Sequence, residues 1–219
     1  MGSPTGRHPP TFTTMEIDLA ALPPREAHAW MIATILPRPI AWISTVSRDG
    51  RSNLAPFSYF QAISARPPLL MFVAANTRDG TPKDTLRNVR EVPEFIVHLV
   101  PFAQAETMNA TAAPLPHGES EFDRFGVAAT PAARVRPPRV AAAPVAFECA
   151  VERELPFGEG PGAATVVFGR ILHTHVRDDV LGTDGRPDPA RLDLIGRLGG
   201  EGYARTREIF TVRRPDGAP

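Results

Sequence analysis

The stretch from Pro37 to Phe60, PRPIAWISTVSRDGRSNLAPFSYF, restricts the fold more than any other part of this 219-residue chain. Its first X-Pro pair excludes a helix interior, and the apolar run that follows is typical of a strand over Ile40–Ser47. Asp49-Gly50 is the signal of a tight hairpin turn. A second short strand then breaks into a polar, proline-kinked loop at Asn53–Phe60. The stretch therefore predicts two antiparallel strands joined by a tight turn.

The rest of the chain continues this pattern of short strands and turns. Apolar runs predict further strands at Leu69–Ala75, Glu94–Val100, Val145–Leu155 and Ala163–Val176. The first of these is so apolar that we expect a central strand buried on both faces. Few helical stretches intervene, and parallel βαβ units would need a regular helix between strands. We therefore expect a mainly β domain, an antiparallel barrel with attached helices, in which closure of the sheet protects the strand edges.

Composition and charge narrow the function classes. Lys+Arg and Asp+Glu both total 24, so the net charge is zero, and no basic excess points to nucleic acid or a membrane surface. No apolar run approaches the ~20 residues of a membrane span. The first ten residues lack the apolar segment of a signal peptide, so a cytoplasmic protein is expected. The single cysteine, Cys149, excludes an intrachain disulfide and is expected to be a buried, inert thiol.

A chain of this length fits one domain with a sizeable core. Residues 1–14 are rich in Pro, Gly, Ser and Thr, and we expect a disordered or extended arm there. The domain itself is expected to span residues 15–213, with a mobile tail at 214–219. Near its end, residues 190–198 should form a helix-like turn, and the apolar run Ile209–Val212 should close the fold.

The clearest local chemistry lies at Thr81-Pro82-Lys83-Asp84, before the predicted helix DTLRNVREV. A capping hydroxyl, a proline at the first helical position and an acid three residues after the cap are typical of a helix start. Such an end presents unpaired N–H groups and a partial positive charge, which favour anions. Lys83 and Thr85 add a charge and a hydroxyl. A phosphate site is physically reasonable, and an ordinary capped surface helix with a solvated lysine is the alternative.

Other residues whose side chains could take part in catalysis or binding have simpler interpretations. His98 stands alone in a strand, and we expect a core histidine with satisfied hydrogen bonds. His117 is expected to be exposed and receives no role. Gly169, inside a long strand, indicates a bulge or a close approach to the backbone. The chain has no G-x-G-x-x-G turn opening a helix, so a Rossmann-type nicotinamide site is not expected. It also has no nucleophile elbow, metal signature or carboxylate pair.

Six motifs, in order along the chain, resemble those of one known family. Three are specific as a set: RPIAWIST at Arg38–Thr45, NLAPFSYF at Asn53–Phe60 and NTRDGTPKDTLRN at Asn76–Asn88. Three are weaker: GESEFDRFG at Gly118–Gly126, PVAFEC at Pro144–Cys149 and VVFGRILHTHV at Val166–Val176. In these motifs the chain resembles the flavin reductase-like, FMN-binding split-barrel proteins, from about residue 30 to residue 212. That family includes NAD(P)H:flavin oxidoreductases, reductase components of two-component monooxygenases and flavoredoxins.

The resemblance implies a six-stranded antiparallel Greek-key split barrel, forming a homodimer with FMN, or alternatively FAD, near the subunit boundary. It implies that NAD(P)H stacks on the exposed flavin face and gives it a hydride, and that reduced flavin is supplied to a partner monooxygenase or another acceptor. Gly118–Gly126 is implied to lie over the cofactor or at the subunit boundary. Two alternatives remain open: a flavoredoxin-like FMN electron-transfer protein without efficient NAD(P)H turnover, and a non-flavin ligand-binding barrel.

The same resemblance implies a set of flavin contacts. The ring would lie against the Asn53–Ser58 segment, the ribityl chain beside Ser44 and Thr45, and the phosphate at Asn76–Thr85. The candidate cofactor-binding residues are Ser44, Thr45, Asn53, Leu54, Ala55, Ser58, Asn76, Thr77, Lys83, Asp84, Thr85, Phe168 and Tyr203. Lys83 would be the charge partner of the phosphate, and Asp84 would cap the helix. No residue is assigned a catalytic role, because a bound flavin itself accepts hydride.

Overall fold

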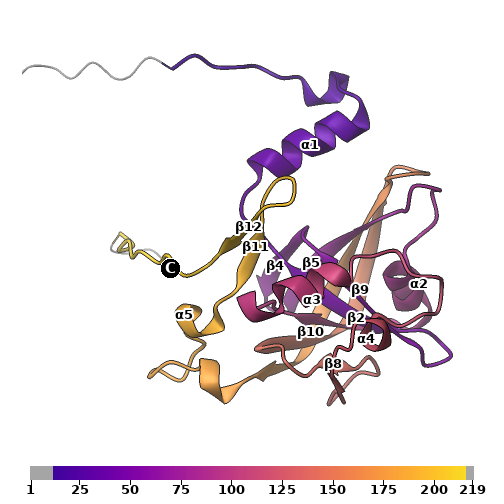
Figure 1. Ribbon diagram of the computed structural model, residues 1–219, viewed down its shortest axis with the longest axis vertical. Helices are drawn as coiled ribbons and strands as arrows, with labels where there is room; N and C mark the ends of the chain where they lie inside the picture. Colours follow the sequence, from indigo (N-terminus) through magenta and orange to yellow (C-terminus); the bar gives the residue numbers. More distant parts are fainter. Residues whose placement is uncertain (1–11, 216–219) are drawn as a thin grey trace, which may run out of the picture.

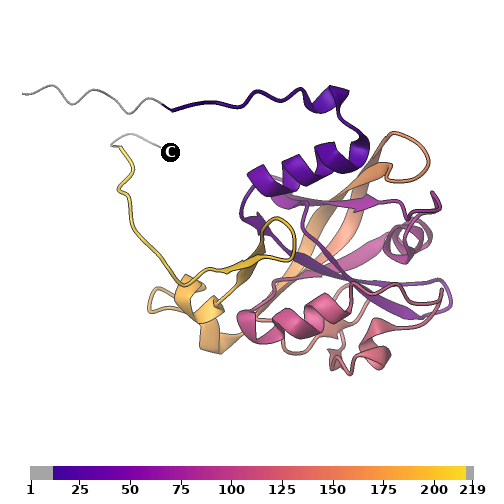
Figure 2. The same cartoon turned by 45° about the horizontal axis from the view of Figure 1, so that its top comes forward.

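The computed structural model describes residues 12–215, and Figures 1 and 2 show a β barrel with helices attached around it. The strands are β1 Arg38–Pro39, β2 Ala41–Val46, β3 Ser52–Phe57, β4 Phe60–Ala65, β5 Pro68–Ala75, β6 Glu94–His98, β7 Ala129–Thr130, β8 Arg139–Val140, β9 Val145–Phe157, β10 Ala164–Val176, β11 Ile195–Arg197 and β12 Tyr203–Arg205. The helices are α1 Pro24–Thr34, α2 Asp84–Glu91, α3 Ala105–Ala110, α4 Glu121–Arg124 and α5 Pro189–Leu192, with short 3-10 turns η1 Leu19–Ala21, η2 Phe102–Gln104 and η3 Asp178–Val180.

The main sheet is antiparallel, with the strand order β3-β2-β6-β9-β10-β5-β4. Its two edge strands, β3 and β4, are not hydrogen-bonded to each other, yet β3 contacts β5 across the opening. The ring of Phe57 on β3 lies 5.2 Å from that of Phe72 on β5, which in turn lies 5.2 Å from Phe95 on β6. The sheet therefore curls into a barrel that stays open along one seam, and the expected antiparallel split barrel is confirmed.

Strand β2 separates two hydrophobic cores because alternate residues of a strand point to opposite faces. Ala41 and Ile43 face the barrel interior, whereas Ile40 and Trp42 face a second core beneath α3 and α4. All six residues of β2 are buried. The strand buried on both faces is thus β2, and the prediction of this role for Leu69–Ala75 was wrong: β5 alternates buried with partly exposed residues.

The segment after the Asp49-Gly50 turn also differs from the prediction. Asn53–Phe60 was expected to be a loop, but β3 continues through Phe57 and only Ser58 and Tyr59 separate it from β4. Pro56 is tolerated inside this strand because β3 lies at the edge of the sheet, where a missing N–H breaks no ladder. Phe60–Ala65 becomes a strand of its own, so the sheet contains seven strands, one more than expected.

Helix α1 contributes no buried residue, and Arg38 hydrogen-bonds to its C-terminal end. This buried guanidinium donates to the carbonyl oxygens of Ile32 and Ile35 at the helix end, and to that of Leu198 beside β11. Figure 2 shows the helix lying over one end of the barrel. The small sheet β1-β11-β12 therefore couples α1 to the barrel.

The C-terminal predictions were wrong in two places. Residues 190–198 contain the end of α5 and then strand β11, because Asp193 adopts the left-handed conformation and ends the helix. Ile209–Val212 does not close the fold: it forms no regular element, and Phe210 is 85% exposed. Of the expected terminal arm and tail, residues 1–11 and 216–219 lie outside the described residues. Within residues 12–215, no helix has the length and apolar character needed to cross a bilayer.

Three predictions about individual core residues are confirmed. Cys149 is wholly buried, and burial raises the pKa of its thiol. His98 is also wholly buried, with Nδ1 donating to the Trp42 carbonyl oxygen at 2.8 Å and Nε2 accepting from the Val140 N–H at 3.0 Å. Gly169 lies at a register shift between β9 and β10, where the ring of Phe95 occupies the space a side chain would need.

Candidate functional site

A cavity of about 370 Å³ lies where β3, the segment 77–83, the first turn of α2 and the segment 111–117 meet. Its size falls at the lower end of the range for small-molecule sites, about 300–1,000 Å³. The lining residues are Asn53, Ala55, Pro56, Thr77, Thr81, Pro82, Lys83, Asp84, Thr85, Arg87, Thr111, Ala112, Ala113, Pro114, Leu115, His117 and Glu121. The wall is therefore mixed: hydroxyls and charges gather around α2, and small apolar residues come from β3 and the segment 112–115.

The start of α2 differs from the predicted cap. Helical geometry begins at Asp84, and Lys83 occupies the N-cap position with an extended backbone and no side-chain cap bond. The Thr81 hydroxyl does not cap the helix, because it bonds to Asp79 and Thr77 instead. Asp84 does not cap it either, since its Oδ1 accepts from Arg87 at 3.4 Å and lies 2.8 Å from Nδ1 of His117. The first turn of the helix thus has no capping side chain of its own.

The segment leading to α2 is a tight loop organised by Asp79. Its carboxylate accepts hydrogen bonds from the hydroxyl of Thr77 and from the hydroxyl and N–H of Thr81, and these lower the pKa of Asp79 to about 2. Asn76 Nδ2 donates to the carbonyl oxygens of Gly80 and Gly160, each at 3.1 Å, and so fixes the loop to the β9–β10 hairpin tip. Asn76 therefore positions the loop and does not line the cavity.

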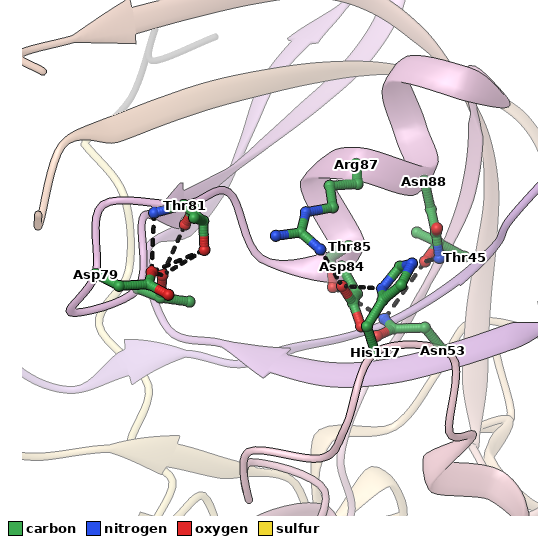
Figure 3. A network of polar contacts seen from close by, with 10 residues as sticks. Thr45, Asn53, Asp79, Thr81, Asp84, Thr85, Arg87, Asn88 and His117 are labelled. Carbon is green, nitrogen blue, oxygen red and sulfur yellow. Dashed lines mark hydrogen bonds and ion pairs between the residues drawn. The ribbon is translucent and has the colours of Figure 1, made fainter. Parts of the chain in front are cut away.

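A chain of amides and hydroxyls connects β2, β3 and α2 behind the cavity, as Figure 3 shows. Asn53 Nδ2 donates to Thr85 Oγ1 at 3.0 Å and lies 3.4 Å from Thr45 Oγ1, which also accepts from Asn88 at 3.0 Å. All four residues are buried. Because neutral groups satisfy one another here, the network fixes the start of α2 against the barrel without placing a charge beneath it.

Two ionisable groups have pKa values shifted by this environment. Lys83 is exposed as a residue, but its ammonium lies 5.8 Å from the centre of the Phe57 ring, and desolvation lowers its pKa. Among the described residues, no hydrogen bond or ion pair involves this ammonium. Glu121 is buried at the opposite wall, where desolvation raises its pKa although Oε2 accepts the Leu54 N–H at 2.8 Å. A partly desolvated cation without a partner suits an anionic ligand group.

The structure brings together six of the thirteen candidate residues around this cavity: Asn53, Ala55, Thr77, Lys83, Asp84 and Thr85. Thr45 lies one hydrogen bond behind them. The remaining six do not line it. Leu54 packs in the second core, Ser44 donates to the Pro138 carbonyl oxygen, and Ser58 accepts from Arg38. Asn76 holds the loop in place, Phe168 lies opposite Met71 of the neighbouring strand β5, and the Tyr203 hydroxyl donates to Asn109.

Sequence reasoning missed the wall contributed by the segment 111–121. Thr111, Leu115, His117 and Glu121 all line the cavity, and Arg87 adds a guanidinium from α2. The GESEFDRFG motif was implied to lie over the cofactor, which is the signal that points to Glu121. Nothing in the local sequence distinguishes His117, because its proximity to Asp84 depends on how the loop folds back.

The geometry and the comparisons agree on the class of protein. The flavin reductase like domain family matches residues 33–190, and the chain belongs to this family of FMN-binding split barrels. A crystal structure of nitrilotriacetate monooxygenase component B from Bacillus cereus superposes with a TM-score of 0.87 at 31% identity, covering 92% of this chain and 100% of that one.

Two further proteins are similar over nearly the whole chain. The 2-nitrobenzoate 2-nitroreductase of Pseudomonas fluorescens superposes with a TM-score of 0.82 at 28% identity, covering 94% of this chain and 98% of that one. An uncharacterized protein of Halalkalibacterium halodurans is 38% identical over 203 residues, covering 92% of this chain and 97% of that relative.

Proposed function

We propose that this protein is an FMN-binding oxidoreductase that transfers hydride from NAD(P)H to flavin. The observation that carries the proposal is the cavity at the start of α2, where an unpaired, partly desolvated lysine faces the space between β3 and the segment 111–117. It occurs in a chain of the flavin reductase family. A nucleotide phosphate fits both observations, because the family binds FMN and the cavity presents a cation to an anionic group.

The phosphate end is proposed to lie at Lys83, Thr85 and Thr77. Lys83 supplies the charge, and the uncapped N–H groups at the start of α2 remain available to an anion. The carboxylate of Asp84 would oppose a phosphate, but Arg87 and His117 both contact it. The local donor set therefore fits a phosphate monoester.

The ring end is proposed to lie along Asn53, Ala55 and Pro56 of β3. On the unpaired side of this edge strand Glu121 already accepts the Leu54 N–H and Pro56 has no N–H, so the strand contributes mainly small side chains that leave room for a flat heterocycle. Of the other candidate residues, Thr45 would act through Asn53, and the six outside the cavity would have structural roles within one protomer.

A bound flavin would supply the redox chemistry, since it can be reduced by one hydride from the nicotinamide together with one proton from solvent. The protein's part is to bind the nucleotide, to orient its ring and to leave one face open. Similarity to a monooxygenase component leads us to propose that the reduced flavin serves a partner monooxygenase.

A homodimer is proposed on the exposed apolar surface of α1 and β4. Each of five apolar residues is at least 39% exposed: Trp30 and Met31 on α1, Ile35 and Leu36 directly after it, and Ile63 on β4. Apolar exposure of this extent is typical of an interaction surface. Light scattering on the purified protein should give the mass of two chains, and a monomer at micromolar concentration would contradict this assignment.

The test of the function is spectroscopic. Purified protein is mixed with FMN and its absorption spectrum recorded, and NADH or NADPH is then added without oxygen. Bleaching of the flavin bands with multiple turnovers of free FMN is expected. A protein that binds FMN but turns over poorly would be a flavoredoxin-like carrier, and one that takes up no FMN would be a non-flavin barrel.

A further inference from the structure

A second cavity of about 360 Å³ lies beside the first and shares four of its lining residues, Asn53, Asp84, Arg87 and His117. The rest of its wall comes from the β2–β3 turn and Ser52, from α2 at Asn88, Arg90 and Glu91, and from residues 118–119. The two cavities are therefore neighbouring parts of one polar groove along the start of α2. The four shared residues lie where the two cavities meet.

The contact between His117 and Asp84 crosses the boundary between these cavities. Nδ1 of His117 lies 2.8 Å from Oδ1 of Asp84, and Figure 3 shows the imidazole reaching from its loop toward the start of α2. The base of this loop is fixed on β3: the Ser52 and Ser120 hydroxyls are 2.8 Å apart, and Glu121 accepts the Leu54 N–H. His117 thus extends as a bridge from an anchored loop.

We propose that the His117–Asp84 contact closes the phosphate end of the flavin cavity and so selects FMN over FAD. The inference rests on the proposed function, in which the flavin phosphate lies at Lys83 and Thr85. FAD extends from that same phosphate through a pyrophosphate bond to AMP, which carries the second phosphate. A mononucleotide fits within one cavity, whereas a dinucleotide needs the neighbouring one and must displace the bridge.

The charges around the second cavity make it usable by AMP once the bridge is open. Arg51, Arg87 and Arg90 line it, and guanidinium groups bind phosphate and stack on purine rings. Carboxylates line it as well, and Arg90 is already paired with Glu154 at 2.9 Å. The affinity gained by binding AMP in this cavity is therefore modest, and the need to displace the bridge is what discriminates between FMN and FAD. One hydrogen bond to a carboxylate corresponds to about a tenfold change in affinity.

The test is isothermal titration of the intact protein with FMN, FAD and riboflavin, for the wild type and three variants. His117→Ala removes the bridge, and His117→Gln keeps a side chain that can donate to Asp84. His173→Ala is a matched control at an exposed position of β10. Circular dichroism and the melting temperature verify that each variant is folded.

The wild type and His173→Ala should bind FMN at least about tenfold more tightly than FAD, and His117→Ala should lose most of that preference because FAD no longer has to displace the contact. His117→Gln should keep the preference. Equal affinities for FMN and FAD in the wild type, or an unchanged ratio in His117→Ala, would overturn the proposal while leaving flavin binding intact. A wild type that binds none of the three flavins would instead overturn the proposed function.

Discussion

His98 should make the stability of this protein depend on pH in a window where few other groups titrate. The neutral ring donates from Nδ1 to Trp42 and accepts at Nε2 from the Val140 N–H. Protonation would put an N–H on Nε2, directly facing the Val140 N–H, inside a wholly buried site. Burial accordingly lowers the pKa of His98 to about 4 from an ordinary value of 6.5.

The sign and size follow from proton linkage. The unfolded chain binds a proton at His98 below pH 6.5, whereas the folded protein does so only near pH 4. The stability contributed by the neutral ring is therefore complete above pH 6.5 and is lost as the pH falls toward 4. Between pH 7.5 and pH 5, this single group should lower the free energy of unfolding by about 2 kcal/mol.

The assay is urea denaturation followed by tryptophan fluorescence at several pH values in that range, with His98→Gln as the reference. The amide can replace part of the hydrogen bonding but does not titrate, so the variant should lack the loss of about 2 kcal/mol. Glu121, with its raised pKa, works in the opposite direction and is present in both proteins. If the wild type and the variant lose stability in parallel as the pH falls, the assignment of a buried neutral His98 is wrong.

Two further substitutions test the site and the core. Lys83→Ala should weaken FMN binding by about 1.5–3 kcal/mol, the value of a hydrogen bond to a charged group, in a flavin fluorescence titration; unchanged affinity would contradict the phosphate assignment. Gly169→Ala should lower the free energy of unfolding by about 1–3 kcal/mol through overpacking, because its methyl group would overlap the Phe95 ring, and urea denaturation at pH 7.5 measures this; a neutral effect would mean that the ring can move aside.

The order of strands and turns followed from local pattern, because alternation, apolar runs and turn residues act over a few positions. The Asp49-Gly50 hairpin and the long β9–β10 pair are examples. Which strand would be buried on both faces could not be predicted from local pattern. Leu69–Ala75 is the more apolar run, yet β2 receives α3 and α4 on its outer face, and the position of those helices is a tertiary property.

For the candidate site, too, some features could be predicted from local sequence and others depend on the fold. The groups available near Lys83 were already evident from local sequence, because a lysine and hydroxyls before a helix can favour an anion. Which of these groups share the cavity depends on the folded structure. It turned Leu54 into the core, placed Ser58 under Arg38 and brought His117 to Asp84, 33 residues away along the chain. Contacts between distant segments depend on how loops return over the barrel, and that path is set by packing and not by local preference.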